Sequence, residues 1–95
     1  MRYEIILSPE AIEDLRNLTA YWRARVKDAI ETHLRNEPTK ESKSRIKRLR
    51  GLSQPQYRLR ENEIRVFYDV SSGAVEILGI VLKSEAETWL SRIGE

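Results

Sequence analysis

The residues most able to do chemistry in this chain are lysines and arginines that gather in one segment. Residues 40–60, here called the basic block, carry a net charge of +7, although the 95-residue chain has a formal charge of only +2. The block holds one acid, Glu41, and eight cationic residues: Lys40, Lys43, Arg45, Lys47, Arg48, Arg50, Arg58 and Arg60. A guanidinium can grip two phosphate oxygens at once, and a concentrated positive field attracts polyanions. The basic block therefore predicts a site for a polyanion such as nucleic acid.

A strand pattern at the end of the basic block adds a third arginine. Residues 57–60 and 63–70 alternate as two antiparallel strands around a turn at Glu61-Asn62. One face collects apolar side chains: Tyr57, Leu59, Ile64, Val66, Tyr68 and Val70. The other face carries Arg58, Arg60, Arg65 and Phe67. A two-residue turn would place Arg58 opposite Arg65, and because like charges facing each other are destabilising, we expect an anion to compensate them.

The elements before the basic block predict a strand followed by two helices. Residues 3–7 alternate with apolar side chains on one face. Ser8 can cap a helix whose first residue is Pro9, and helical spacing of apolar residues continues to Asn36. One straight helix of that length would project beyond so small a domain. We therefore predict a helical hairpin that breaks near Thr19.

The elements after the hairpin predict a central strand and a short helix. Residues 75–81 are apolar on both faces, as in a strand with neighbours on both sides. Ser84 and Glu87 have the spacing of a capping box, and the following apolar stripe contains Ala86, Trp89, Leu90 and Ile93. The predicted fold class is α+β: a small antiparallel sheet in the order β-α-α-β-β-β-α, with the helical hairpin packed on one face and a short C-terminal helix.

Composition narrows the class of protein. The content of 40% hydrophobic and 34% charged residues fits one soluble globular domain over residues 1–95. The chain has no cysteine, which excludes disulfides and thiolate metal sites and favours a reducing cytoplasm. Its beginning lacks a signal-peptide pattern, and no apolar run is long enough to span a membrane. His33 is the lone histidine and cannot build a metal site or a catalytic dyad, so we interpret it as structural or exposed.

Three segments carry a resemblance to a known family. They are Ile46-Lys47-Arg48-Leu49-Arg50-Gly51-Leu52, Tyr57-Arg58-Leu59-Arg60 and Ile64-Arg65-Val66-Phe67-Tyr68. Together with the order of elements, they resemble the RelE/ParE superfamily of toxins from bacterial toxin–antitoxin pairs, and more closely its RelE branch. The resemblance implies a RelE-like fold and a small ribosome-dependent endoribonuclease that cuts messenger RNA in the decoding site, without a metal or other cofactor.

The resemblance also implies roles for individual residues. Arg58 and Arg60 match paired basic positions that hold and activate the RNA backbone, and Arg65 matches the arginine that stabilises the scissile phosphate. Lys83 matches a second phosphate-binding or proton-donating residue, and Trp89 an aromatic residue that stacks on a base. The chain departs from many relatives in having no histidine or tyrosine near the carboxyl end, so the resemblance does not imply strong acid–base catalysis.

The chemistry that these residues could do is cleavage of RNA by its own 2′-hydroxyl. The enzyme must align the hydroxyl with the phosphorus and stabilise the charged phosphorane. Arginines can do this, whereas their high pKa makes proton transfer difficult, so Lys83 is the better candidate for moving protons. The remaining basic residues would contact phosphate without reading sequence: Lys43, Arg45, Lys47, Arg48 and Arg50.

Plainer interpretations stay open for the same residues. The arginines could form a solvated sheet face, and residues 40–50 a mobile loop. Trp89 lies on the apolar stripe of its helix, so core packing is at least as good an explanation as base stacking. Glu61 and Glu63 flank the hairpin and could act as a base, but a turn position and a salt bridge explain them more simply.

Two functions of other classes also remain. One is a ParE-like toxin that inhibits gyrase and has no nuclease activity, and the other is a noncatalytic nucleic-acid-binding module. If the toxin interpretation holds, the resemblance implies a RelB-like antitoxin, and charge complementarity predicts that it is acidic, wraps the basic surface and displaces the last helix. The other expected partners are the ribosome, its messenger RNA and, for the toxin–antitoxin complex alone, operator DNA. No membrane partner is expected.

Overall fold

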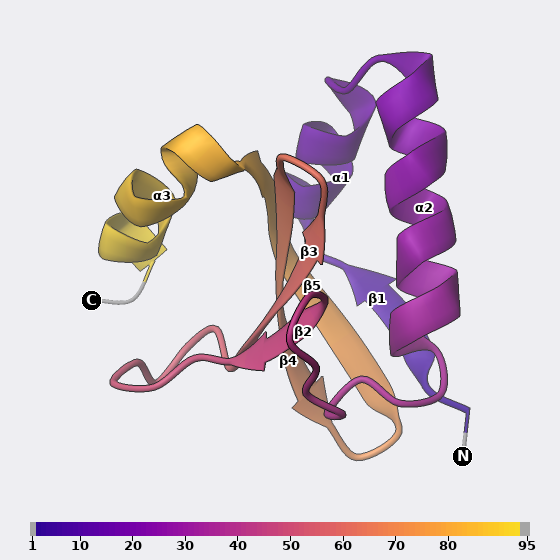
Figure 1. The fold of residues 1–95 in the computed structure, drawn as a ribbon, viewed down its shortest axis with the longest axis vertical. Coiled ribbons are helices and arrows are strands. Elements are labelled where there is room, and N and C mark those ends of the chain that lie inside the picture. Colours follow the sequence, from indigo (N-terminus) through magenta and orange to yellow (C-terminus); the bar gives the residue numbers. More distant parts are fainter. Residues whose placement is uncertain (1, 94–95) are drawn as a thin grey trace.

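The strands form one five-stranded mixed sheet in the order β1-β5-β4-β3-β2 (Figure 1). In this computed structural model, which describes residues 2–93, the strands are β1 (Glu4–Leu7), β2 (Ile46–Arg48), β3 (Tyr57–Glu61), β4 (Ile64–Ser71) and β5 (Ala74–Leu82). β1 runs parallel to β5, whereas the other neighbours are antiparallel. The all-antiparallel sheet predicted from the sequence is wrong at this pair. Hairpins force antiparallel pairing, but a long connection through helices lets two strands run parallel.

The helical hairpin begins at two hydroxyl caps. α1 (Pro9–Arg16) starts after Ser8, whose Oγ accepts a hydrogen bond from the Ala11 amide at 3.0 Å. α2 (Ala20–Leu34) starts after Thr19, whose Oγ1 accepts from the Trp22 amide at 3.5 Å. Each oxygen satisfies an amide that has no partner within its helix. The predicted break near Thr19 is confirmed, and both helices cover one face of the sheet (Figure 1).

The main core lies between this hairpin and the sheet. From α2 it contains Val26, Ala29, Ile30 and Leu34, and from the strands Leu59, Ile64, Val66, Tyr68, Val75 and Ile77. Tyr68 is its largest fully buried side chain; its ring stacks on Tyr57 and its hydroxyl donates to the Pro38 carbonyl at 2.6 Å. Burial raises the pKa of Tyr68. The predicted apolar faces of β1, β3 and β4 are confirmed.

The second face of the sheet is partly covered by the last helix, α3 (Ala86–Ile93) (Figure 1). Trp89 is 4% exposed and stacks on Phe67 with ring centroids 4.9 Å apart. Its ring lies so close to Gly79 that a Cβ atom there would be 2.6 Å from Trp89 Cε2. The indole Nε1 also donates to Glu10 Oε2 at 2.6 Å, which ties α3 to α1.

Two local predictions differ from the structure. α3 is preceded by a 3-10 turn, Lys83–Glu85, and Ser84 lies inside this turn instead of capping the helix. The sequence predicts no strand at β2, because three residues with two cations give too little alternation to indicate one. Its one apolar residue, Ile46, is buried and pairs with Leu59. Within residues 2–93, no helix is long and apolar enough to cross a membrane.

Candidate nucleic-acid interface

The open part of the second sheet face carries Arg58, Arg60 and Arg65, here called the arginine row. Arg60 lies directly opposite Arg65, and Arg58 lies between Lys47 on β2 and Phe67 on β4. The predicted pairing of Arg58 with Arg65 is therefore wrong by two residues, because the partner of Arg65 is Arg60. β3 runs on to Glu61, and the turn is Asn62-Glu63, with Asn62 in the left-handed region at φ 57°. Asparagine tolerates this conformation better than most residues, so the turn falls one residue later than predicted.

Arg65 is the most fixed member of the arginine row. Its side chain is 6% exposed, and Nη1 donates to the Asn62 carbonyl at 2.7 Å and the Ile64 carbonyl at 3.2 Å. Burial lowers the pKa of Arg65, and the positive charges of Arg58 and Arg60 lower it further. A guanidinium nevertheless remains charged at neutral pH. The turn backbone thus holds one preoriented cation at the turn end of the row.

Arg58 has a hydrogen-bond donor that lacks an acceptor. It is half-buried, and its Nε is buried with no hydrogen-bond partner. Burial lowers the pKa of Arg58, followed by repulsion from Arg60. Among the ion pairs of residues 2–93, none involves a member of the arginine row. A buried donor without a partner costs free energy, and an anion on this face would remove the repulsion between the arginines.

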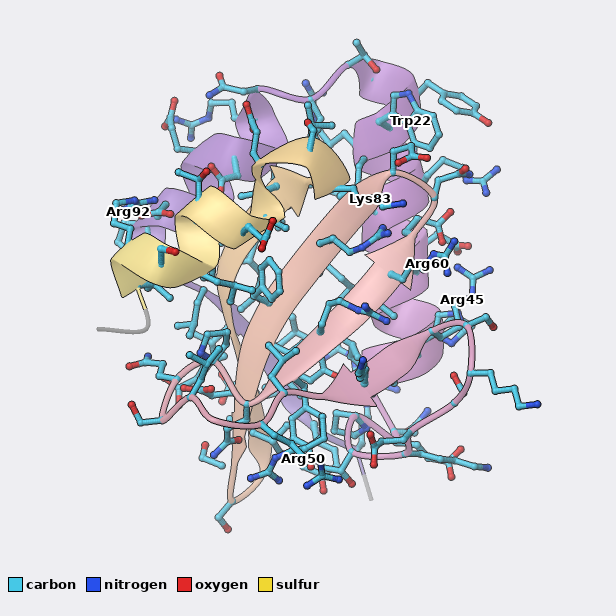
Figure 2. All side chains as sticks on the ribbon, turned by 60° about the vertical axis from the view of Figure 1, so that its left-hand side comes forward. Trp22, Arg45, Arg50, Arg60, Lys83 and Arg92 are labelled. Atoms are coloured by element: carbon cyan, nitrogen blue, oxygen red, sulfur yellow. The ribbon has the colours of Figure 1, made fainter. Side chains whose placement is uncertain are left out.

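Lys83 lies beside the same hairpin turn. It directly follows β5, and its backbone amide donates to the Glu63 carbonyl at 2.7 Å. Figure 2 shows the Lys83 and Arg60 side chains in the same upper region of the sheet. The four predicted catalytic residues therefore come from the hairpin and the end of β5: Arg58, Arg60, Arg65 and Lys83.

The rest of the basic block is divided between different surfaces. Lys47 pairs with Arg58 across β2 and β3 and so shares the face of the arginine row. Arg48 pairs with Tyr57, where its guanidinium lies 5.1 Å from the ring centroid and donates to the hydroxyl at 3.1 Å. Lys43 and Arg50 are exposed on the segments before and after β2, with Arg50 far from Arg60 in Figure 2. Only part of the predicted RNA-binding set is thus brought together.

Trp89 has its ring packed inside the protein. The contacts with Phe67, Gly79 and Glu10 agree with the core-packing alternative, and base stacking would require α3 to move. His33 is partly buried on α2 and lines a hollow beside residues 40–46. No group of three or more potential metal-binding side chains occurs in the described part of the chain.

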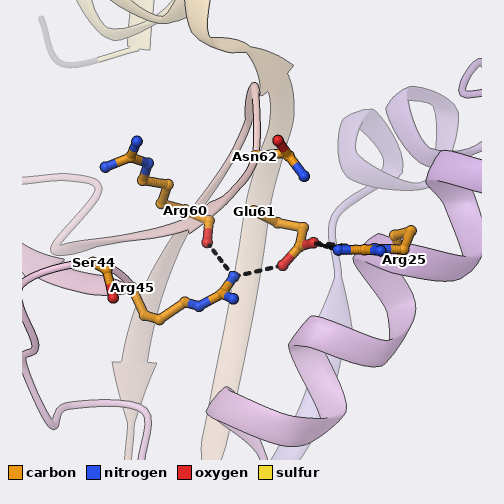
Figure 3. Close-up of a pocket in the computed structure, with 6 residues that line it drawn as sticks. All are labelled: Arg25, Ser44, Arg45, Arg60, Glu61 and Asn62. Carbon is orange, nitrogen blue, oxygen red and sulfur yellow. Dashed lines mark hydrogen bonds and ion pairs between the residues drawn. The ribbon is translucent and has the colours of Figure 1, made fainter.

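Sequence reasoning missed the network around Glu61. This carboxylate is 5% exposed and accepts hydrogen bonds from Arg25 Nη2 at 2.9 Å and Arg45 Nη1 at 2.6 Å (Figure 3). Burial acts to raise the pKa of Glu61, but the two arginines outweigh it and the pKa is lowered. The predicted salt bridge is confirmed, whereas the turn position is wrong, because Glu61 ends β3. Glu61 follows Tyr57 and Leu59 at two-residue spacing, so it lies on the same buried side of the strand, and this spacing was the signal for burial.

A comparison with family models gives the decisive observation. The model described as "ParE toxin of type II toxin-antitoxin system, parDE" matches residues 5–87. The chain belongs to the RelE/ParE superfamily of toxins from type II toxin–antitoxin systems. No curated protein sequence matches this toxin significantly.

Solved structures show the same fold for this toxin. An arginine-substituted mutant of E. coli toxin RelE in the free state matches with a TM-score of 0.73 at 21% identity, covering 98% of this chain and 99% of that chain. The RelBE2 toxin–antitoxin complex from Mycobacterium tuberculosis matches with a TM-score of 0.73 at 23% identity, covering 86% and 99%. The RelB-RelE complex from Methanococcus jannaschii matches with a TM-score of 0.68 at 19% identity, covering 88% and 96%. The superfamily and the RelE-like fold are confirmed, and the RelE branch stays a prediction.

Proposed function

We propose that this toxin is a ribosome-dependent, metal-independent endoribonuclease that cuts messenger RNA in the decoding site. The observation that carries the proposal is the arginine row: three guanidiniums on adjacent strands, a buried Nε without a partner, and no carboxylate paired with them among residues 2–93. Such an arrangement is costly when empty and favourable around a phosphate.

The proposed reaction breaks the RNA backbone without a protein nucleophile. The 2′-oxygen attacks the neighbouring phosphorus, the bond to the 5′-oxygen breaks, and the products are a 2′,3′-cyclic phosphate and a 5′-hydroxyl. Arg65, fixed by the turn carbonyls, would bind the scissile phosphate and stabilise the charge of the phosphorane. Arg58 would contact the same group with its terminal guanidinium nitrogens, and Arg60 would hold the adjoining backbone.

Proton transfer is assigned to Lys83 in this proposal. Its ammonium would give a proton to the departing 5′-oxygen, while the 2′-hydroxyl proton passes to water or to a ribosomal group. This toxin lacks a histidine in the arginine row and its surroundings, since His33 lies on α2 at a different surface. Orientation of the RNA by the ribosome would then supply much of the rate, which explains a requirement for the ribosome.

A second candidate is a ParE-like toxin that inhibits gyrase without nuclease activity. The observation that favours it is the family match itself, because the matching model is described for ParE toxins. The arginine row would then bind an anionic surface of its target without cutting it. Intact gyrase supercoiling in the presence of the toxin would count against this candidate.

The proposed partner outside the ribosome is an acidic, RelB-like antitoxin. Two of the structural relatives are toxin–antitoxin complexes, the RelB-RelE complex from Methanococcus jannaschii and RelBE2 from Mycobacterium tuberculosis, which supports a partner of this kind. An acidic chain would neutralise the arginine row and Lys47 together. Operator DNA is proposed as a ligand of the toxin–antitoxin complex alone.

The test is cleavage of a defined message on stalled ribosomes, with new RNA ends mapped by primer extension. We expect cuts at the decoding-site codon that disappear without ribosomes and with Arg58→Ala or Arg65→Ala. Arg16→Ala is the matched control, since Arg16 is exposed on α1 and pairs only with Glu13 among the described contacts. Absence of cuts by the wild-type toxin would refute the proposal and direct the next assay to gyrase.

A further inference from the structure

Glu61 joins three separate parts of the molecule through one buried carboxylate. It is the last residue of β3, Arg25 comes from α2, and Arg45 comes from the segment before β2 (Figure 3). Oε2 accepts from Arg25 Nη2 at 2.9 Å and Nε at 3.3 Å, and Oε1 accepts from Arg45 Nη1 at 2.6 Å. The same Arg45 nitrogen donates to the Arg60 carbonyl at 3.2 Å. Each carboxylate oxygen therefore anchors a different element.

The backbone of the turn that follows Glu61 makes hydrogen bonds to two of the proposed catalytic residues, Arg65 and Lys83. Glu61 pairs with Ile64 across the hairpin, and Asn62-Glu63 lies between them. The carbonyls of Asn62 and Ile64 are the acceptors of Arg65 Nη1, and the Glu63 carbonyl accepts from the Lys83 amide. A shift of this turn would move the Arg65 guanidinium and the start of the Lys83 segment together.

We propose that Glu61 is a positioning residue for the RNA-cleaving site, acting through the turn on Arg65 and Lys83. The inference rests on the proposed nuclease function. The carboxylate is needed because both of its oxygens must accept hydrogen bonds, one from each arginine. A glutamine would offer one acceptor oxygen and turn its NH₂ group toward the donors of the other arginine. Arg45 then has a structural task in place of the predicted contact with RNA phosphate.

The direction of the Glu61 carboxylate explains why it is not itself an acid or base for the reaction, although a pocket lies beside the network. This pocket has a volume of about 300 Å³ and is lined by Arg25, Ser44, Arg45, Arg60, Glu61 and Asn62. In Figure 3 the Arg60 side chain extends away from the Glu61 carboxylate, which faces α2. Glu61 thus acts from the helix side of the sheet, whereas the arginine row lies on the other face.

The test measures cleavage on stalled ribosomes for Glu61→Gln, Arg25→Gln and the double variant. We expect kcat to fall by about 10- to 100-fold in each single variant, because a displacement of about 1 Å can cost two orders of magnitude. The ribosome concentration at half-maximal rate should change less than about twofold, since the arginine row still binds. The double variant should fall no further than either single variant, because both substitutions break the same link.

Two controls separate positioning from general loss of structure. Glu31→Gln removes an exposed carboxylate that pairs with Arg35, the residue that caps the end of α2, and it should keep the wild-type kcat. Cosedimentation of each variant with ribosomes carrying a message that lacks the reactive 2′-hydroxyl gives the fraction of competent protein, which should stay near that of the wild type. All rates are measured well below the melting temperature of each variant.

The outcomes distinguish this inference from the proposed function. A Glu61→Gln toxin with wild-type kcat and only a lowered melting temperature would overturn the inference, as would kcat losses that multiply in the double variant. A wild-type toxin that makes no cuts would overturn the proposed function and this inference with it. A fall in kcat with unchanged half-saturation and competent fraction supports the inference.

Discussion

Substitution of Gly79 by alanine tests how α3 is held on the sheet. A Cβ atom at this position would lie 2.6 Å from Trp89 Cε2 and 2.9 Å from Nε1, whereas carbon atoms pack at about 3.5–4.0 Å. The indole must therefore retreat by about 1 Å. The indole is held in two places, since its ring stacks on Phe67 and its Nε1 donates to Glu10 Oε2 at 2.6 Å.

The cost follows from the contacts that this retreat breaks. Loss of the aromatic stack costs about 0.5–1.5 kcal/mol, and loss of a hydrogen bond to a charged group about 1.5–3 kcal/mol. Replacing a strand glycine by alanine offsets about 0.5–1 kcal/mol of this cost, because the unfolded chain has less conformational entropy to lose with alanine. We expect a net destabilisation of about 1–4 kcal/mol, which corresponds to a fall in Tm of roughly 5–20 °C for a domain of this size.

The assay is thermal unfolding followed by circular dichroism, with the fluorescence of Trp89 recorded in a Trp22→Phe background. We expect a red-shifted Trp89 emission together with the lowered Tm. Gly51→Ala is the matched control: Gly51 has φ 81°, so alanine is strained there, but no atom lies within 4 Å of the added Cβ. A Gly79→Ala protein with a Tm within about 2 °C of the wild type and unchanged emission would refute this account of the α3 contact.

Three further predictions concern the charged residues. In phosphate-free buffer, Arg60→Gln should raise Tm by about 1–4 °C, because it removes repulsion across the ladder with Arg65; a lowered Tm would contradict the repulsion. In binding of an uncleavable single-stranded RNA, Arg58→Gln should reduce the slope of log K against log salt by about 0.7, while Arg45→Gln should leave it unchanged, as fluorescence anisotropy can measure. The pKa of Glu61 is lowered from its ordinary value of 4.5, so its ionised carboxylate stabilises the fold fully above pH 4.5. This stabilisation is lost as the pH falls through the pKa of the folded state. The free energy of unfolding measured in urea should therefore be about 1–3 kcal/mol higher for the wild type than for Glu61→Gln at pH 7, and this difference should shrink below pH 4. A difference that stays constant with pH would exclude the ionised carboxylate as its source.

Local periodicity predicted much of the fold because it depends on neighbouring residues alone. The inward faces of β1, β3 and β4 follow from the two-residue repeat of a strand, and the start of α2 follows from a hydroxyl cap at Thr19. The arginine row was predicted for the same reason. The residues that resemble the RelE/ParE superfamily lie mostly in these regular segments, and the family match confirms that resemblance.

The features that sequence did not predict depend on distant residues. The parallel pairing of β1 with β5 joins segments about 70 residues apart, and β2 becomes a strand only because β3 lies beside it. Arg60 faces Arg65 because the turn, with Asn62 at a positive φ, begins one residue later than predicted. Alternation of apolar residues cannot fix the residue at which a turn begins. The burial of the Glu61 carboxylate required knowing that Arg25 and Arg45 would meet there.

The position of β2 at the outer edge of the sheet affects how this protein meets other chains. An edge strand can offer backbone groups to a further strand, which is a common route to aggregation. On β2 the Ile46 carbonyl already accepts from the Ser42 amide at 2.9 Å, and the Arg48 amide already donates to Glu41 Oε1 at 2.9 Å. β2 has only three residues, and Lys47 and Arg48 are both exposed on it. A second copy would bring the same cations against them and be repelled, whereas a chain rich in acidic residues would be attracted. The exposed charge and the occupied backbone groups of β2 thus both disfavour self-association at this sheet edge.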